Sequence, residues 1–189
     1  MKKLILAASV ALLTACATPQ QEQIDFMPNS VLSNSDIVSG KSYNLTSRDS
    51  RSAQYVALLD SGRSNIEPIH ARQNLRVSIE KVMAEQFASQ GFRNAVQSDN
   101  VIDIDIQEAL VNVTQSAMSH EMVAHVSLAL TLETPTGKMV KTYTGSAQKK
   151  DSFGASRQDI QDVLNDVTDN VLIEISQDQE LQNYMKERF

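Results

Sequence analysis

The chain has 189 residues, and its 17 Lys and Arg against 23 Asp and Glu give a formal net charge of −6. This acidic balance excludes nucleic acid as the main partner, because a phosphate backbone requires a basic face. The single Cys excludes an internal disulfide and a cysteine-rich zinc site, and 41% apolar residues are too many for a disordered chain. The length predicts one domain that buries enough surface to be stable without such cross-links.

The N-terminus has the layout of a secretory signal peptide over residues 1–15. Lys2 and Lys3 precede an apolar run from Leu4 to Leu13, which is far shorter than the roughly 20 residues that span a bilayer. A retained membrane span and a secreted chain that is cut elsewhere are therefore the less favoured alternatives.

The apolar run ends in Leu13-Thr14-Ala15-Cys16, which resembles the lipobox of bacterial lipoproteins. The resemblance implies that Cys16 becomes the first mature residue, with diacylglycerol on its thiol and a third acyl chain on its amine. Several acyl chains anchor a protein durably, whereas one chain binds a membrane only marginally. Ala17 stands where Asp holds enterobacterial lipoproteins in the inner membrane, so the resemblance implies an outer-membrane protein that faces the periplasm. We expect no cofactor besides this covalent lipid.

Residues 16–40 are rich in Gln, Asn, Ser and Pro, which predicts a lipidated N-terminus followed by a flexible tether. Ile24, Phe26 and Met27 allow one short apolar contact within it. The folded periplasmic domain is expected over residues 41–189. Loss of residues 1–15 removes two lysines, so the mature chain has 15 basic and 23 acidic residues and a net charge of about −8.

Two short strands and a helix are expected at the start of the domain. Tyr43 and Leu45 alternate with polar neighbours, and a second apolar run follows at 55–59. The helix is indicated by apolar residues that share one face at helical spacing, namely Leu75, Ile79, Val82, Met83 and Phe87. Gly91 is placed to cap this helix, which predicts that it ends near Gln90.

A change of phase marks the next strand. Ile102, Ile104 and Ile106 alternate on even numbers, but from Ala109 onward the apolar residues fall on odd numbers. A one-residue slip turns side chains to the other face of a sheet. The pattern therefore predicts a β-bulge near residues 107–109, or burial on both faces there.

Two further strands are expected over residues 122–132 and 139–147, with a hairpin turn at Pro135-Thr136-Gly137-Lys138 between them. Ser156, with Asp159 three residues later, has the pattern of a capping box and predicts the start of a long helix. Asp178 is expected to cap a short C-terminal helix. The apolar stripe of the long helix consists of Ile160, Val163, Leu164, Val167, Val171 and Ile175.

The predicted order is β-β-α-β-β-β-α, followed by the short C-terminal helix. The expected fold class is α+β, with a two-layer arrangement of an antiparallel sheet packed by two amphipathic helices. One face of the sheet meets the helices, and the other face is mixed in polarity and meets water or a partner.

Few residues have the pattern of a reactive site. His120-Glu121 and His125 resemble a zinc-protease motif, but a spacing of five on a strand places the two imidazoles on opposite faces. Asp103 and Asp105 share a strand face and could serve acid–base chemistry, although a solvated face explains them more simply. The mature sequence has no phosphate loop, serine-hydrolase elbow or cysteine nucleophile, so we expect no enzyme activity.

The long C-terminal helix has an acidic face, since no Lys or Arg occurs from Gln158 to Met185. This face is either simply solvated or a docking surface for a basic partner, whose binding would weaken with salt. Asp49 and Arg51 are likewise either an ion pair that shapes a turn or part of a binding edge. We define the acidic strip as Asp159, Asp162, Asp166 and Asp169.

Several segments carry a family resemblance besides the lipobox. They are Asp49-Ser50-Arg51, Asn74 to Met83, Ala88 to Phe92, Gly137-Lys138-Met139 with Tyr143, Phe153, and Ile175 to Asp178. Together they resemble the YajG family of gamma-proteobacterial lipoproteins over roughly residues 40–187. None of them is a catalytic signature, so the resemblance implies a location and a fold rather than a reaction.

The expected function is that of a non-catalytic lipoprotein, held on the outer membrane by its lipid, whose periplasmic domain binds an envelope protein or a cell-wall component. The alternative is a carrier or sensor of a small apolar ligand, such as a lipid, between helices and sheet. Five Phe and seven Met would allow a soft cavity for such a ligand. The sequence specifies neither the partner nor an oligomeric state.

Overall fold

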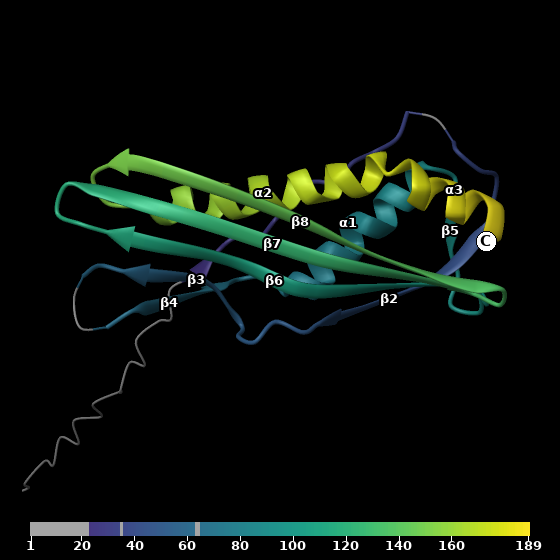
Figure 1. Ribbon diagram of the computed structural model, residues 1–189, viewed down its shortest axis with the longest axis horizontal. Helices are drawn as coiled ribbons and strands as arrows, with labels where there is room; N and C mark the ends of the chain where they lie inside the picture. Colours follow the sequence, from purple (N-terminus) through teal and green to yellow (C-terminus); the bar gives the residue numbers. More distant parts are fainter. Residues whose placement is uncertain (1–22, 35, 63–64) are drawn as a thin grey trace, which may run out of the picture.

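A computed structural model describes residues 23–34, 36–62 and 65–189. In it, α1 and α2 lie along the same side of a curled mixed sheet, and α3 follows at one end (Figure 1). The elements are β1 (Gln23–Ile24), β2 (Ser42–Asp49), β3 (Tyr55–Asp60), β4 (Glu67–Ala71), α1 (Leu75–Ser89), β5 (Arg93–Asn94), β6 (Val101–Gln115), β7 (Ser119–Thr134), β8 (Gly137–Ser152), α2 (Arg157–Gln177) and α3 (Gln179–Arg188).

Three long strands, β6, β7 and β8, form an antiparallel meander. The register between β6 and β7 shifts between Ile106 and Glu108, which confirms the predicted bulge. Ile106 and Ala109 are an odd number of residues apart, so a regular strand would place them on opposite faces. The extra residue at the bulge allows both to be buried on the same face. The predicted hairpin is also confirmed, because Thr134 pairs with Gly137 across the β7–β8 turn.

The other side of β6 holds two shorter strands, one after the other. β2 pairs in parallel with residues 101–106 of β6, and β3 pairs in parallel with residues 111–114. β5 extends the sheet from β2, while β4 and then β1 extend it from β3. The sheet is therefore mixed in direction and curled into a half-barrel.

The prediction of a simple two-layer antiparallel sheet is wrong in this respect. Alternation of apolar residues shows which face a strand buries, but it does not show the direction of its neighbour. The predicted element order also lacked β1, β4 and β5. β1 and β5 have two residues each and β4 has five, including Pro68, so none of them has a clear alternating pattern.

The predicted apolar stripes of both long helices are buried and form the core with the sheet. α2 packs on β6, β7 and β8, while α1 packs on β2 and β5. Gly145 of β8 permits a close approach, since a Cβ there would lie 2.8 Å from Cγ2 of Val171 on α2. Gly91 has a φ of +92° after α1, which confirms its predicted role in ending that helix.

The segment before β2 packs against the domain, and we call residues 23–34 the N-terminal strap. Ile24 and Phe26 are fully buried, and the strap contacts both α1 and α2 through hydrogen bonds. The predicted start of the folded domain at residue 41 is therefore too late. Because Ile24 and Phe26 are two residues apart on an extended chain, both side chains enter the same apolar layer.

Candidate functional site

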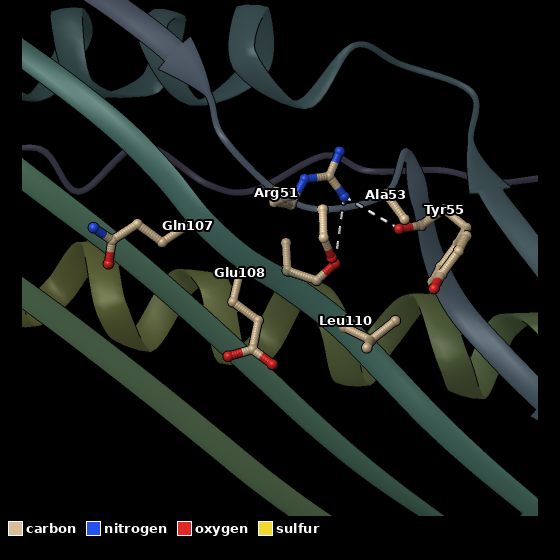
Figure 2. A pocket seen from close by; sticks show the side chains of 8 residues that line it. Arg51, Ala53, Tyr55, Gln107, Glu108 and Leu110 are labelled. Atoms are coloured by element: carbon tan, nitrogen blue, oxygen red, sulfur yellow. Dashed lines mark hydrogen bonds between the residues drawn. The ribbon is translucent and has the colours of Figure 1, made fainter.

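A pocket of about 180 Å³ lies beside the bulge of β6 (Figure 2). It exists because β2 pairs only as far as Ile106, whereas β3 pairs from Val111 onward. Residues 107–110 of β6 thus border a gap between two strands. The lining residues are Arg51, Ser52, Ala53, Tyr55, Gln107, Glu108, Ala109 and Leu110.

Arg51 closes this gap with its guanidinium group. Its Nε and Nη2 donate to the carboxylate of Asp49 at 2.9 and 2.8 Å, and Nη1 donates to the carbonyl oxygens of Tyr55 at 3.2 Å and Ala109 at 3.5 Å. The Arg51 side chain is only 6% exposed, so this bidentate pair is largely removed from water. Burial opposes the ionisation of Asp49, but Arg51 outweighs burial and holds the pKa of Asp49 below its usual range.

A second polar cluster connects β2 with the first half of β6. Arg48 donates to Asp103 at 2.6 Å and to Asp105 at 3.1 Å, and the hydroxyl of Ser50 donates to Asp105 at 2.6 Å. Burial opposes the ionisation of Asp105, but the bonds from Ser50 and Arg48 outweigh it and lower the pKa of Asp105. The two carboxylates that share a strand face are thus cross-linked by Arg48 rather than directed into an open cavity.

The turn after β2 therefore contains the ion pair that the sequence indicated. The guanidinium group of Arg51 donates to Asp49, Tyr55 and Ala109, and it thereby bridges β2, the start of β3 and the bulge of β6. What the pocket offers a ligand is a shallow surface with the carboxylate of Glu108 and the amide of Gln107. A binding role for Asp49 and Arg51 remains a prediction.

Two members of the acidic strip have partners outside α2. Asp159 accepts from the backbone N–H of Ser156 at 3.0 Å in the predicted capping box, and Nζ of Lys149 is 3.8 Å away. Asp169 accepts from the backbone N–H and the side-chain amide of Asn29 at 2.8 and 2.6 Å. These contacts stabilise the start of α2 and the N-terminal strap, so they reduce what the strip offers to a partner.

The other two members of the strip lie on the exposed face of α2. Asp162 and Asp166 are solvent-exposed, and Asp162 accepts from the side-chain amide of Gln158 at 2.7 Å. The free part of the acidic strip is therefore centred on these two carboxylates, which are four residues apart on one helical face.

The N-terminal strap is held by a hydrogen-bond ladder that was not predicted from the sequence. Alternate backbone N–H groups from Asp25 to Asn29 donate to side chains on α2: Asp25 to Gln161 at 2.9 Å, Met27 to Asn165 at 3.1 Å, and Asn29 to Asp169 at 2.8 Å. The two periods match, because two residues of extended chain advance about 6.8 Å and four residues of α-helix rise about 6 Å.

A sequence signal for this ladder does exist. Gln161, Asn165 and Asp169 repeat hydrogen-bonding side chains at a spacing of four, next to the apolar stripe of the same helix. The strap has further contacts at its start, where Arg72 donates to Asp25 at 2.6 Å and Gln73 accepts from the N–H of Phe26 at 2.7 Å. The ladder connects two segments about 140 residues apart in the chain, so local patterns alone did not link them.

The two histidines lie on opposite sides of β7, as predicted. His120 is buried, and its Nδ1 is 2.8 Å from the carbonyl oxygen of Phe153. His125 is exposed on the other face. The pair therefore cannot ligate one zinc ion.

Comparison with known proteins identifies the family. A family model described as "Uncharacterized lipoprotein" matches residues 28–186. The chain belongs to this lipoprotein family. It is 27% identical over 191 residues to the uncharacterized lipoprotein YajG of Escherichia coli K12, across 99% of this chain and 98% of that protein. YajG of Escherichia coli O6:H1 gives the same values, and the resemblance to the YajG family is confirmed.

The fold of this lipoprotein is similar to that of a solved protein from Xanthomonas campestris. The TM-score is 0.56 at 12% identity, and the match covers 87% of this chain and 95% of the other. At that identity the likeness shows the fold alone. Neither the family description nor the names of the YajG relatives assign a reaction to this lipoprotein.

The predicted signal peptide and Cys16 lie outside the described residues. Within the described ranges, no helix combines the length and apolarity that a bilayer span requires. The lipoprotein family and the sequence around Cys16 both point to a lipid anchor.

Proposed function

We propose that this protein is a non-catalytic lipoprotein of the outer membrane, anchored by acyl chains on Cys16, whose domain faces the periplasm and binds an envelope protein or a cell-wall component. The observation that carries the proposal is the single Cys, which ends a lipobox-like sequence in a chain of a lipoprotein family. A thiol in a thioether cannot form disulfides, so this Cys is compatible with an oxidising compartment.

The N-terminal strap supports a role close to the membrane. Gln23 already pairs with His70 in the sheet, so only seven peptide steps separate Cys16 from the folded domain. At about 3.6 Å per residue, this connection reaches at most about 25 Å. The proposed anchor therefore holds the domain against the membrane surface, where it serves as an adaptor rather than as a freely ranging module.

The exposed face of α2 is the surface that we propose for partner binding. Asp162 and Asp166 lie exposed at its centre. A basic partner would find two adjacent carboxylates there, and its association would weaken with salt.

The carrier alternative has less support from the packing. A ligand held between helices and sheet would need the volume that Phe26, Phe87, Met83, Met122 and Met185 occupy, and all five are buried in the core. Four pockets lined by described residues hold about 180, 250, 280 and 260 Å³ and lie at the surface. Drug-sized ligands usually occupy enclosed pockets of about 300–1,000 Å³.

Two measurements test the proposal. The mass of the N-terminal peptide from membrane-extracted protein should equal that of a chain starting at a triacylated Cys16; an unmodified Met1 would contradict the anchor. For partner binding, a photo-crosslinking residue at Asp166 should give an adduct in cells, and one at Thr142 on the opposite sheet face should not. An adduct that survives in an Asp162→Asn chain and in high salt would contradict recognition by the acidic face.

A further inference from the structure

The two ends of the sheet differ in what surrounds them. We call one end of the sheet the anchor end: β3, β6 and β8 end there, and β4, β7 and α2 begin there. The strand register places these termini together, because Asp60 at the end of β3 pairs with Thr114 near the end of β6, and Ser119 at the start of β7 pairs with Ser152 at the end of β8. The opposite end, with the β7–β8 turn and the loop before β6, is the far end. Figure 1 shows the anchor end on the left and the far end on the right.

Two large apolar side chains project from the anchor end next to each other. Met118 is 82% exposed in the β6–β7 hairpin, and Phe153 is 80% exposed between β8 and α2. The N–H of Phe153 donates to the carbonyl of Met118 at 3.0 Å, so the two residues are in direct contact through their backbones. The N–H of Ser116 donates to the carbonyl of Ser119 at 2.8 Å, and His120 holds the carbonyl of Phe153. These hydrogen bonds hold the backbone at Met118 and Phe153 in place.

Phe153 has an unfavourable backbone conformation in addition to its exposed ring. Its φ is +69°, and it is the one non-glycine residue in the described chain with a positive φ. This region is costly for a bulky L-residue, and glycine or asparagine would occupy it more easily. A strained, solvent-exposed Phe does not improve the folded domain, so the observation favours a use for its side chain outside the domain.

The path of the N-terminus links this end to the proposed anchor. β1 runs parallel to β4, which leads away from the anchor end, so the chain enters β1 from that side. Cys16 lies within about 25 Å of Gln23 by the same reach of seven residues. Gln23 lies opposite His70, which pairs with Tyr55 at the start of β3, so β1 joins the sheet part-way along its length. The 15 residues of β6 separate the two ends of the sheet by about 50 Å, at roughly 3.3 Å per residue.

We propose that Met118 and Phe153 insert into the interfacial layer of the phospholipid bilayer that holds the Cys16 lipid. This inference rests on the proposed lipid anchor. Ile66 is also exposed at this end, just before β4. A lipid anchor and an adjacent apolar contact together fix the orientation of the domain, whereas the anchor alone would leave it free to rotate.

The contact is apolar rather than ionic. Two lysines near this end have acidic partners, with Lys150 3.3 Å from Glu121 and Lys149 3.8 Å from Asp159. The mature chain is also strongly acidic, so it is not drawn to anionic lipid by its net charge. Membrane contact through Met118 and Phe153 should therefore be insensitive to salt.

A fluorophore placed on single cysteines tests this orientation. The thiol of Cys16 is blocked by its lipid in the proposed mature protein, so Met118→Cys, Phe153→Cys and Val96→Cys each add one reactive thiol. Val96 is the matched control, because it is 84% exposed in the loop before β6 at the far end. The labelled full-length lipoproteins are reconstituted in vesicles of phosphatidylethanolamine and phosphatidylglycerol that contain a lipid-attached quencher, with circular dichroism to verify folding.

We expect quenching at positions 118 and 153 to exceed that at 96 by about threefold, at low and high salt alike, since interfacial side chains lie about 5–10 Å deep. Equal quenching at all three positions on vesicle-bound protein would overturn the inference and leave the anchor intact. Protein that does not bind vesicles because Cys16 lacks lipid would overturn the proposed function, and the inference with it. If the fluorophore at position 118 escapes quenching in vesicles and becomes buried only when an envelope protein is added, the surface is a protein interface and the inference is wrong.

Discussion

The two hairpins of the β6–β7–β8 meander join strands of nearly equal length but expose different chemistry. The β6–β7 hairpin presents Met118 beside Phe153. The β7–β8 hairpin turns through Pro135 and Thr136 and is flanked by Lys138 and Glu133, whose charged atoms are 2.6 Å apart. Tight turns favour small and polar residues, so the polar β7–β8 hairpin has the residues expected of a turn with no further role. The apolar hairpin, at the anchor end, departs from this pattern.

The interactions that close the two ends differ as well. The N-terminal strap enters from the anchor side and runs along α2, which holds its backbone from Gln161 to Asp169. The far end is closed by an ionic cluster in which Lys141 lies 2.5 Å from Asp178 and the hydroxyl of Tyr143 donates to Asp178 at 2.8 Å. We therefore expect substitutions at the two ends to respond differently to cavity formation and to pH.

The largest expected effect is at Phe26, where the strap enters the core. Phe26→Ala should lower the free energy of unfolding by about 3–4 kcal/mol, because it leaves a cavity under the strap. Met27→Ala is the control, since Met27 is 61% exposed and should change stability by less than about 0.5 kcal/mol. Urea unfolding of both variants measures this difference. Similar losses in the two variants would contradict the described path of the strap.

The far end should show the stronger pH dependence, through Asp178. Burial opposes its ionisation, but Lys141, the N–H of Leu181 and Tyr143 outweigh it and lower the pKa of Asp178 to about 2, from 3.8. Because the pKa is lower in the folded state, the carboxylate stabilises the fold above about pH 4, and this contribution is lost as the pH falls toward 2.

Asp178→Asn keeps a good N-cap for α3 and removes the charge. At pH 7 it should cost about 2 kcal/mol of unfolding free energy, and the difference from wild type should close between about pH 4 and pH 2. Asp166→Asn, on the exposed face of α2, is the control and should change little at any pH. A difference that stays constant from pH 7 to pH 2 would contradict the ionic account of the far end.

A gain in stability is expected at the anchor end. Phe153→Gly should raise the free energy of unfolding by about 1 kcal/mol, because glycine tolerates a φ of +69°. Val96→Gly in the far-end loop has no such strain to relieve and should not stabilise the domain. Thermal unfolding monitored by circular dichroism compares the two. Loss of stability in Phe153→Gly would show that the ring contributes to packing within the domain.

The smallest effect is expected at the polar hairpin. Lys138 and Glu133 are both more than half exposed, so Glu133→Gln should change the free energy of unfolding by less than about 0.5 kcal/mol. The same urea titration measures it. A loss of more than about 1 kcal/mol would mean that this surface pair organises the far end more than its exposure suggests.

Features determined by neighbours in the chain were predictable from the sequence. The capping box of Ser156 and Asp159, the cap by Asp178 and the bulge after Ile106 each depend on residues within a few positions of each other. They were located correctly because side-chain chemistry and alternation determine them locally.

Features that join distant segments were not predictable in this way. The parallel pairing of β2 and β3 with β6 depends on the crossover through α1, which leaves no mark on the strands themselves. The strap looked like a polar tether because its ladder uses backbone N–H groups, which every residue has, and side chains about 140 positions away. For the same reason, the sequence placed Asp169 on a free acidic face, although Asn29 binds it.

The central claim is that lipid on Cys16 holds this domain on the outer membrane, and sucrose-density separation of the membranes tests it most directly. The wild-type chain should band with the outer membrane after a carbonate wash, and Cys16→Ser should move it to the soluble periplasmic fraction. A Cys16→Ser chain that still bands with the outer membrane would contradict the claim, and so would a wild-type chain that bands with the inner membrane.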